Sequence, residues 1–71
     1  MSKRGELYDV QLVVHRETEK AVLVSEAGDP DDAVWLPKSQ VEMYEEVGRH
    51  KFWPIHQFSM PQWLAEEKEL V

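Results

Sequence analysis

Hydrophobic and polar side chains alternate along much of the chain, which predicts a protein built mainly from β-strands. In residues 7–15 an apolar side chain falls at every second position, the pattern of a strand with one buried face. Short apolar runs separated by polar or Gly- and Pro-containing segments predict further strands over residues 21–25, 33–36, 41–46 and 51–58.

Two of these segments carry conflicting signals. Residues 41–46 contain Glu and Met, which also favour helix, so a helix is the alternative to a strand there. Pro54 interrupts residues 51–58, and because proline cannot donate to a strand ladder it indicates a sheet edge or a bulge. The connecting segments are expected to be an exposed loop at 26–32 and turns at 38–40 and 47–50.

The C-terminal segment predicts a helix over residues 61–70. Ser59 and Gln62 have the spacing of a capping box, and Pro61 suits the first turn of a helix. The apolar side chains follow at helical spacing and form one stripe, made of Met60, Trp63, Leu64, Leu70 and Val71. Because so short a helix is marginal alone, it must pack against the sheet.

Together these elements predict a single α+β domain, mainly β, over residues 1–71. The expected architecture is a small five-stranded bent antiparallel sheet, or an SH3- or OB-like barrel, capped by the C-terminal helix. A domain of this length buries only about 60% of the surface of its unfolded chain, so its core must be small. Trp35 and Trp63 are expected to fill that core, because large rings bury much area.

The net charge of −6 is carried by one stretch of the chain, residues 26–46. That stretch holds seven acidic residues and one base, Lys38, whereas the segments on either side are neutral. A DNA duplex is not the expected ligand, because tight binding requires Lys and Arg contacts to phosphate. Acidic side chains steer encounters with a basic protein surface, although acids that merely keep the domain soluble are the simpler interpretation.

A protein partner with a basic surface is therefore the expected ligand. Trp53 is expected to anchor it, since tryptophan is a frequent hot-spot residue and this one adjoins Phe52 and Pro54. The expected partner-binding residues are Asp29, Asp31, Asp32, Glu42, Glu45, Glu46 and Trp53. The alternative is a single-stranded nucleic-acid site formed by Arg49, Lys51, Phe52 and Trp53.

The residues that could carry chemistry do not form an enzyme motif. The chain has no cysteine, and no serine lies in a nucleophile elbow. His15, His50 and His56 lack the spacing of a metal site, and the last two lie about 20 Å apart along an extended strand. Each is interpreted as a surface or hydrogen-bonded histidine. We expect no catalysis, no metal and no cofactor.

The chain also lacks an apolar run of the length needed to cross a bilayer, so no membrane partner is expected and the expected location is the cytoplasm. The edges of so small a sheet could pair with a second copy, which leaves a homodimer as the alternative to a monomer.

Two segments resemble a family of short proteins from phages and other bacterial mobile elements. They are residues 33–42, with the block WLPKSQ, and residues 60–71, which read MPQWLAEEKELV; together they cover about 22 residues. The family has no established catalytic role, and the resemblance implies a bacterial host cell. Small acidic proteins of such elements often act by occupying a host or phage protein, and some inhibit CRISPR effectors. By analogy, the resemblance implies a modulator of a nucleic-acid-handling protein.

Overall fold

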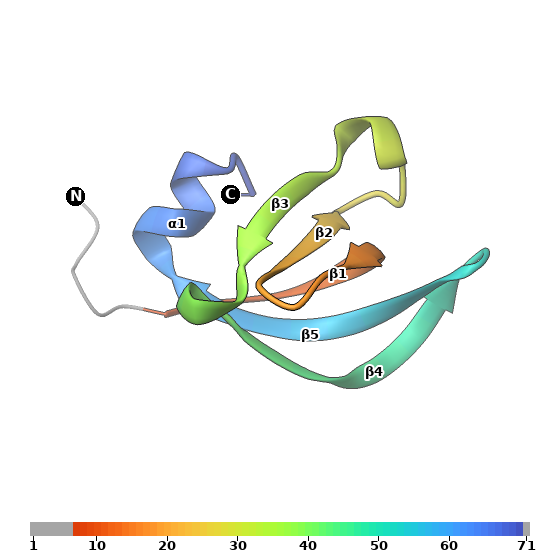
Figure 1. Cartoon of the computed structure of the whole chain (residues 1–71), viewed down its shortest axis with the longest axis horizontal. Helices are drawn as coiled ribbons and strands as arrows, with labels where there is room; N and C mark the ends of the chain where they lie inside the picture. The colour runs from red at the N-terminus through yellow and green to blue at the C-terminus, as the bar shows by residue number, and fades with distance from the viewer. Residues whose placement is uncertain (1–6, 71) are drawn as a thin grey trace.

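Five antiparallel strands form one sheet in the computed structural model, which describes residues 7–70 (Figure 1). In sheet order they are β3 (Val34–Pro37), β2 (Ala21–Ser25), β1 (Leu7–Glu17), β5 (Trp53–Pro61) and β4 (Glu42–His50). Two 3-10 turns, η1 (Pro30–Asp32) and η2 (Lys38–Gln40), flank β3, and helix α1 (Gln62–Glu67) follows β5. The bent five-stranded sheet with a C-terminal helix is confirmed. It remains open, because β3 and β4 do not pair.

The centre of the sheet joins the two strands that are farthest apart in the sequence. β1 and β5 pair from Leu7↔Pro61 to Val13↔Ile55 without a shift of register. Because side chains alternate between the faces of a strand, this register puts Leu12 and Phe58 on the same face. That face is the concave, buried side of the bent sheet.

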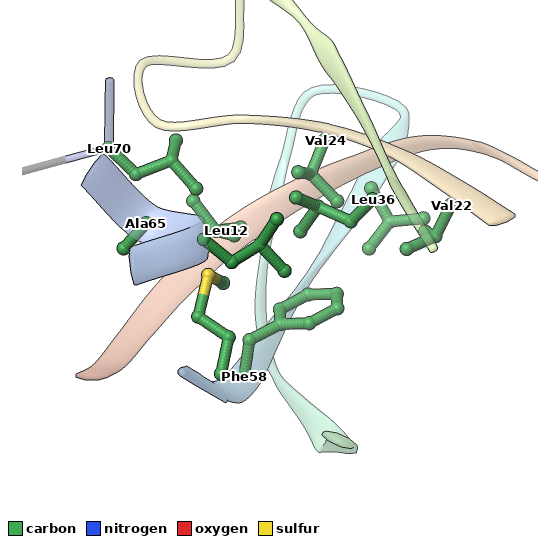
Figure 2. Packing of buried hydrophobic residues seen from close by; sticks show 10 residues of the cluster. Leu12, Val22, Val24, Leu36, Phe58, Ala65 and Leu70 are labelled. Carbon is green, nitrogen blue, oxygen red and sulfur yellow. The ribbon is translucent and has the colours of Figure 1, made fainter. Parts of the chain in front are cut away.

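The core fills this concave side and is completed by the end of the chain (Figure 2). Its buried members come from β1, β2, β3, β5, α1 and the segment after α1, and are Leu12, Val14, Val22, Val24, Leu36, Phe58, Met60, Leu64, Ala65 and Leu70. Phe58 is the largest of the fully buried side chains. The core is therefore built from aliphatic side chains around one aromatic ring.

The prediction that Trp35 and Trp63 fill the core is wrong. Their exposed fractions are 43% and 48%. In β3 it is the next residue, Leu36, that faces the core, so the alternation of the strand turns Trp35 outward. In α1, Leu64 and Ala65 face the sheet, and Trp63 lies outside that buried stripe. Strand and helix geometry thus decided which apolar residues were buried, and ring size did not.

The strand alternative for residues 41–46 is confirmed, but β4 extends further, to His50. The turn expected at 47–50 is wrong, since Gly48, Arg49 and His50 pair with Ile55, Pro54 and Trp53. The reversal falls instead at Lys51 and Phe52. The register of β4 shifts between Met43 and Glu46 and again between Glu46 and Gly48, so β4 is irregular along this edge of the sheet.

Pro54 lies in the part of β5 that has a neighbouring strand, β4, on one side only. The pairing with β1 reaches only Ile55, whereas the pairing with β4 continues through Arg49↔Pro54. Pro54 therefore lies beyond the β1 ladder, where its missing N–H costs the sheet nothing on that side. The expectation of an edge position is met locally, although β5 as a whole lies inside the sheet.

The helix is shorter than expected and begins differently. α1 spans six residues, Pro61 precedes it as the N-cap, and no side chain caps it. Ser59 is not a helix cap: it lies buried in β5, paired with Asp9 and Glu42. The predicted stripe holds for Met60, Leu64 and Leu70, whereas Val71 lies outside the described residues. Within residues 7–70, no helix is long and apolar enough to cross a membrane.

The end of α1 is fixed by a Schellman motif. The Glu69 N–H donates to the Glu66 carbonyl at 3.1 Å, and the Leu70 N–H donates to the Ala65 carbonyl at 2.8 Å. This arrangement requires a left-handed residue after the helix, and Glu69 has a φ of 59°. Leu70 is thereby returned to the core, where the Tyr8 hydroxyl donates to its carbonyl at 2.9 Å.

Replacing Glu69 with glycine should stabilise the protein, because glycine adopts the left-handed conformation without the steric cost that Glu pays. We expect the free energy of unfolding to rise by about 0.5–1 kcal/mol in urea titrations. Glu66→Gly, within the helix, is the matched control and should lower it by about 1 kcal/mol. An equal loss of stability in both variants would contradict the motif.

Candidate functional site

The β4–β5 hairpin extends beyond the rest of the sheet (Figure 1). Its loop consists of two residues, Lys51 and Phe52, and the strands close at His50↔Trp53. Lys51 has a φ of 57°, a conformation that non-glycine residues adopt only at some cost. The turn presents the Phe52 ring to solvent, with 85% of the residue exposed. The hairpin thus ends in a large apolar group held clear of the core.

Trp53 lies behind this tip and is half-buried. Its ring meets that of His15 edge-on, with centroids 4.5 Å apart and planes at 69°. The Phe52 ring lies 6.2 Å from it at 86°, so the two aromatic planes are nearly perpendicular. Trp53 is partly exposed, as its expected role as an anchor requires. Phe52, considered only for the nucleic-acid alternative, is the more accessible ring.

Asp29, the first carboxylate of residues 29–32, lies beside the hairpin. Asp29, Asp31 and Asp32 are all exposed, and the Asp29 carboxylate accepts a hydrogen bond of 2.9 Å from the Asp31 N–H. A cavity of about 300 Å³ lies between this loop and the hairpin. It is lined by Ala27, Gly28, Asp29, Pro30, His50, Lys51 and Trp53. The fold thus brings part of the acidic stretch next to the exposed aromatic tip.

The other three acidic residues of the expected partner-binding set lie on β4, the strand at the edge of the sheet opposite β3. Glu42, Glu45 and Glu46 are exposed there, but two of them have partners. Glu42 accepts a hydrogen bond from the Tyr44 hydroxyl, which raises the pKa of Tyr44. Glu46 pairs with Arg49 at 3.3 Å. The seven expected partner-binding residues therefore form two groups. Asp29, Asp31, Asp32 and Trp53 lie at η1 and the start of β5, whereas Glu42, Glu45 and Glu46 lie along β4.

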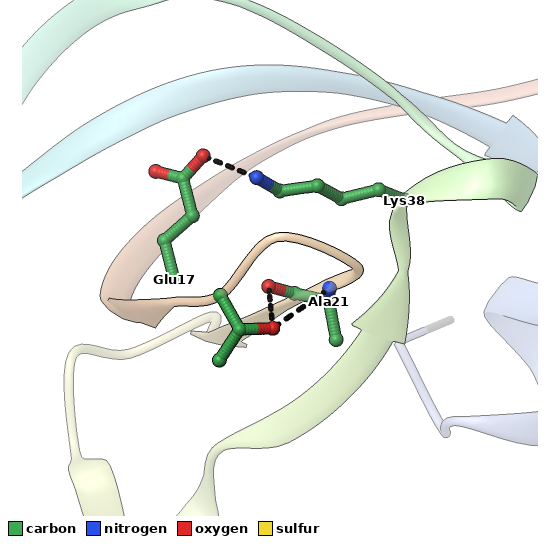
Figure 3. Close-up of polar contacts among 4 residues, drawn as sticks. Glu17, Ala21 and Lys38 are labelled. Atoms are coloured by element: carbon green, nitrogen blue, oxygen red, sulfur yellow. Dashed lines mark hydrogen bonds and ion pairs between the residues drawn. The ribbon is translucent and has the colours of Figure 1, made fainter.

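The single base of the acidic stretch does not neutralise either group. Lys38 lies in η2 and pairs with Glu17 of β1 at 2.6 Å (Figure 3). Next to this pair, the Thr18 hydroxyl both donates to the Ala21 carbonyl and accepts from the Ala21 N–H, which closes the β1–β2 turn. Lys38 thus fastens η2 to the β1–β2 end of the sheet, and the η1 acids retain their negative charge.

His15 and His50, 35 positions apart in the sequence, both contact the segment that runs from Ser25 to Gly28. His15 Nε2 lies 2.7 Å from the Ser25 hydroxyl oxygen, and this oxygen accepts a hydrogen bond of 3.0 Å from the Gly28 N–H. The His50 ring covers Gly28 so closely that a Cβ there would overlap it. We call this cluster the histidine junction; it consists of His15, Ser25, Gly28, His50 and Trp53.

The junction is a structural link and not a nucleophile–base pair. Ser25 is only 2% exposed, so no substrate can reach its hydroxyl. Burial lowers the pKa of His15, and His50 lowers it further, against the opposing effect of Asp29. The third histidine is separate, with its Nδ1 hydrogen-bonded to the Tyr44 carbonyl at 2.7 Å. Among residues 7–70, no three His, Asp or Glu side chains could hold a metal ion together.

Sequence reasoning missed the histidine junction because its members come from β1, β2 and the loop after it, β4 and β5. The strand pattern relates His50 to His56, whereas in the structure His50 packs on Gly28 and His15 contacts Ser25. The one local signal was Gly28, which the loop composition marked as a turn. Gly28 has a φ of 92° and its N–H is held by Ser25.

The fold and this site define a small β-rich domain with an exposed aromatic hairpin tip. Comparison with family models, curated proteins and solved structures finds no match to the chain.

Gly28 should be the glycine that tolerates substitution least. Alanine there would adopt an unfavourable φ and overlap the His50 ring, so we expect Gly28→Ala to lower the free energy of unfolding by more than about 1 kcal/mol. Gly48→Ala is the matched control, because its Cβ would lie 3.8 Å from Ile55 in ordinary contact. Thermal or urea unfolding of both variants checks this. Similar stabilities would contradict the close packing of His50 on Gly28.

Proposed function

We propose that the protein is a non-enzymatic binding module that engages the basic surface of a protein partner. Its binding site is the hairpin–loop face, defined as Asp29, Asp31, Asp32, Lys51 and Phe52. The observation that carries the proposal is the placement of Phe52, 85% exposed at the tip of a projecting hairpin whose Lys51 shares a cavity with the exposed Asp29. The acidic residues of β4 are a second, separate part of the surface.

An exposed phenylalanine at this position has a clear physical use. Burying its ring in a pocket of a partner contributes about 1.5–3 kcal/mol, and aromatic residues in such central positions often dominate binding. The neighbouring carboxylates add long-range attraction to a basic surface, which raises the rate of encounter. Anchor and steering groups thus lie together, as a protein-binding face requires.

Single-stranded nucleic acid is the less suitable ligand for the same residues. Stacking of successive bases requires rings that lie along a basic groove, whereas Phe52 and Trp53 are nearly perpendicular. Arg49 is already paired with Glu46, and the Asp29 carboxylate beside the turn would repel phosphate. Charge and ring geometry both favour a protein.

The resemblance to mobile-element proteins supports a more specific partner. A nucleic-acid-handling protein, for example a CRISPR effector, presents the basic surface that an acidic face would occupy. Occupation of that surface would block the nucleic acid and inhibit the partner. This assignment places the protein in the cytoplasm of a bacterial host cell.

Affinity capture tests the proposal with the immobilised full chain and a lysate of the bacterial host. Phe52→Ala should reduce the amount of the main captured protein by about ten- to a hundredfold, from the lost burial of the ring. Asp31→Lys combined with Asp32→Lys should also abolish capture at moderate salt. Glu66→Lys with Glu67→Lys changes the charge equally on α1 and is the matched control, with capture retained.

The variant Glu45→Lys with Glu46→Lys then shows whether β4 contributes to the same interface. Capture that is unaffected by both the Phe52 and the Asp31/Asp32 variants would overturn the proposal. A titration with single-stranded oligonucleotide at low salt, followed by tryptophan fluorescence, examines the other ligand; strong quenching would also overturn it, since nucleic acid would then be the ligand.

A further inference from the structure

The concave face of the sheet extends past the buried core. Residues that face one another across an antiparallel pair lie on the same side of the sheet. Three residues that are exposed or half-buried each pair with a member of the core, and the pairs are Met43↔Phe58, His56↔Leu12 and Glu17↔Val22. The face that buries the core therefore continues as a surface on which other molecules can lie.

A cavity of about 430 Å³ lies over this continuation. The sheet is open here, since β3 and β4 are joined through η2 and Val41 and do not pair with each other. We call the cavity the open-side pocket; it is lined by Glu17, Lys38, Val41, Met43, Tyr44 and His56. Its volume is within the range of small-ligand sites, and its lining comes from β1, η2, β4 and β5.

The apolar part of the open-side pocket is formed by Val41 and Met43. Both side chains pack against the core but are only partly buried, so they keep apolar surface toward solvent. Tyr44 adds an aromatic ring, with 49% of the residue exposed. A ligand with an alkyl segment would bury this surface, and a charged group beside it could lie against the ring.

The polar part of the pocket consists of hydrogen-bond acceptors on two different strands. His56 Nδ1 lies 2.7 Å from the Tyr44 carbonyl oxygen, which can only accept, so Nδ1 carries the hydrogen. In the neutral ring, Nε2 then holds a lone pair. Glu17 contacts Lys38 through Oε2 alone, which leaves Oε1 able to accept a further hydrogen bond (Figure 3). Two acceptors thus border an apolar floor.

The charge around the pocket favours a cationic ligand. The Lys38–Glu17 pair is neutral in itself, with its two charged atoms 2.6 Å apart. Glu42 and Glu45, which flank Met43 and Tyr44 in the sequence, form no ion pair within residues 7–70. Their carboxylates attract a cation and repel an anion.

We propose that the open-side pocket binds an arginine side chain of a basic protein partner. The methylene stem of the arginine lies on Val41 and Met43, because such stems cover apolar surface while the charged head remains in polar contact. The planar guanidinium has donors enough to reach Glu17 and His56 together, and its face suits the ring of Tyr44. Lysine, as a single point charge, uses fewer of these groups. The inference rests on the proposed function only for the source of the arginine, a protein.

An NMR titration of the free, full-length protein with Nα-acetyl-arginine methylamide tests the pocket directly. The methyl resonance of Met43 reports binding, and that of Met60, which is fully buried in the core, is the internal reference. We expect the Met43 resonance to shift and saturate, with a Kd on the order of a millimolar, while Met60 does not move. The lysine derivative should bind at least about threefold more weakly, and the uncharged leucine derivative more weakly still.

The two members of the ion pair should have opposite effects on this binding. Glu17→Gln removes the charged acceptor and should weaken the arginine derivative by about three- to tenfold. Lys38→Met retains an alkyl side chain but removes the competing cation, and should strengthen binding several-fold. A pair that only stabilised the fold would weaken binding in both variants. Glu66→Gln on α1 is the matched control and should leave the affinity unchanged.

Equal binding of the arginine and leucine derivatives, or shifts of Met43 that never saturate, would overturn the pocket. So would weaker binding in Lys38→Met. Equal affinity for the lysine derivative would overturn the assignment to arginine. The titration contains no partner, so its failure is separate from that of the capture experiment, which depends on Phe52. A saturable pocket combined with capture that ignores Glu17→Gln would overturn only the link between this pocket and the captured protein.

Discussion

The pairing of β1 with β5 is the interaction on which the other features of this protein depend. It joins residues 7–13 to residues 55–61 in one uninterrupted register, and these segments lie at opposite ends of the chain. Closing so long a loop is entropically costly, although the cost grows only slowly with length. The gain in buried apolar surface is large, because this ladder places Leu12 on the face that carries Phe58 and Met60. It also delivers α1 to the core, where Leu64 and Leu70 cover the remaining apolar side chains.

The point at which the β1–β5 pairing ends also determines where the candidate site lies. β1 stops pairing with β5 at Val13↔Ile55, so the β4–β5 hairpin continues alone and lifts Phe52 away from the core. His15 lies just past that limit on β1, which is why its ring can meet Trp53 and reach Ser25. An overhanging hairpin and a half-buried histidine are therefore two consequences of one register.

The open sheet has two edges, and each is unsuited to pairing with another strand in its own way. β3 has four residues and ends at Pro37, which has no N–H to donate. β4 is longer, but its register shifts twice and it displays Glu42, Glu45 and Glu46. In a symmetric dimer through β4 these like charges would face one another. The edges therefore favour contacts through side chains, in keeping with a face built from a turn and a loop.

The amino-acid sequence determined which segments form strands and helix more firmly than it determined which strands pair with one another. Alternation along residues 7–15 and the short apolar runs after it were sufficient for five strands and for the order of sheet and helix. The boundaries were less certain. The sequence predicts the turn at 47–50 instead of at Lys51 and Phe52, and a helix cap at Ser59, because a local pattern cannot show that Gly48 and Ser59 have partners on another strand.

The candidate site was likewise determined only in part by the sequence. Composition located the charge in residues 26–46 and the aromatic residues near Trp53, which are properties that a sequence contains in full. Only the tertiary structure decided that Asp29 lies beside the turn of the hairpin while Glu42 lies at the far end of β4, that Phe52 is exposed while Trp53 packs on His15, and that Trp35 faces outward. The physical reason is that exposure and contact depend on register. Register is set by burial of the whole concave face of the sheet, and that face is assembled from segments that are far apart in the chain.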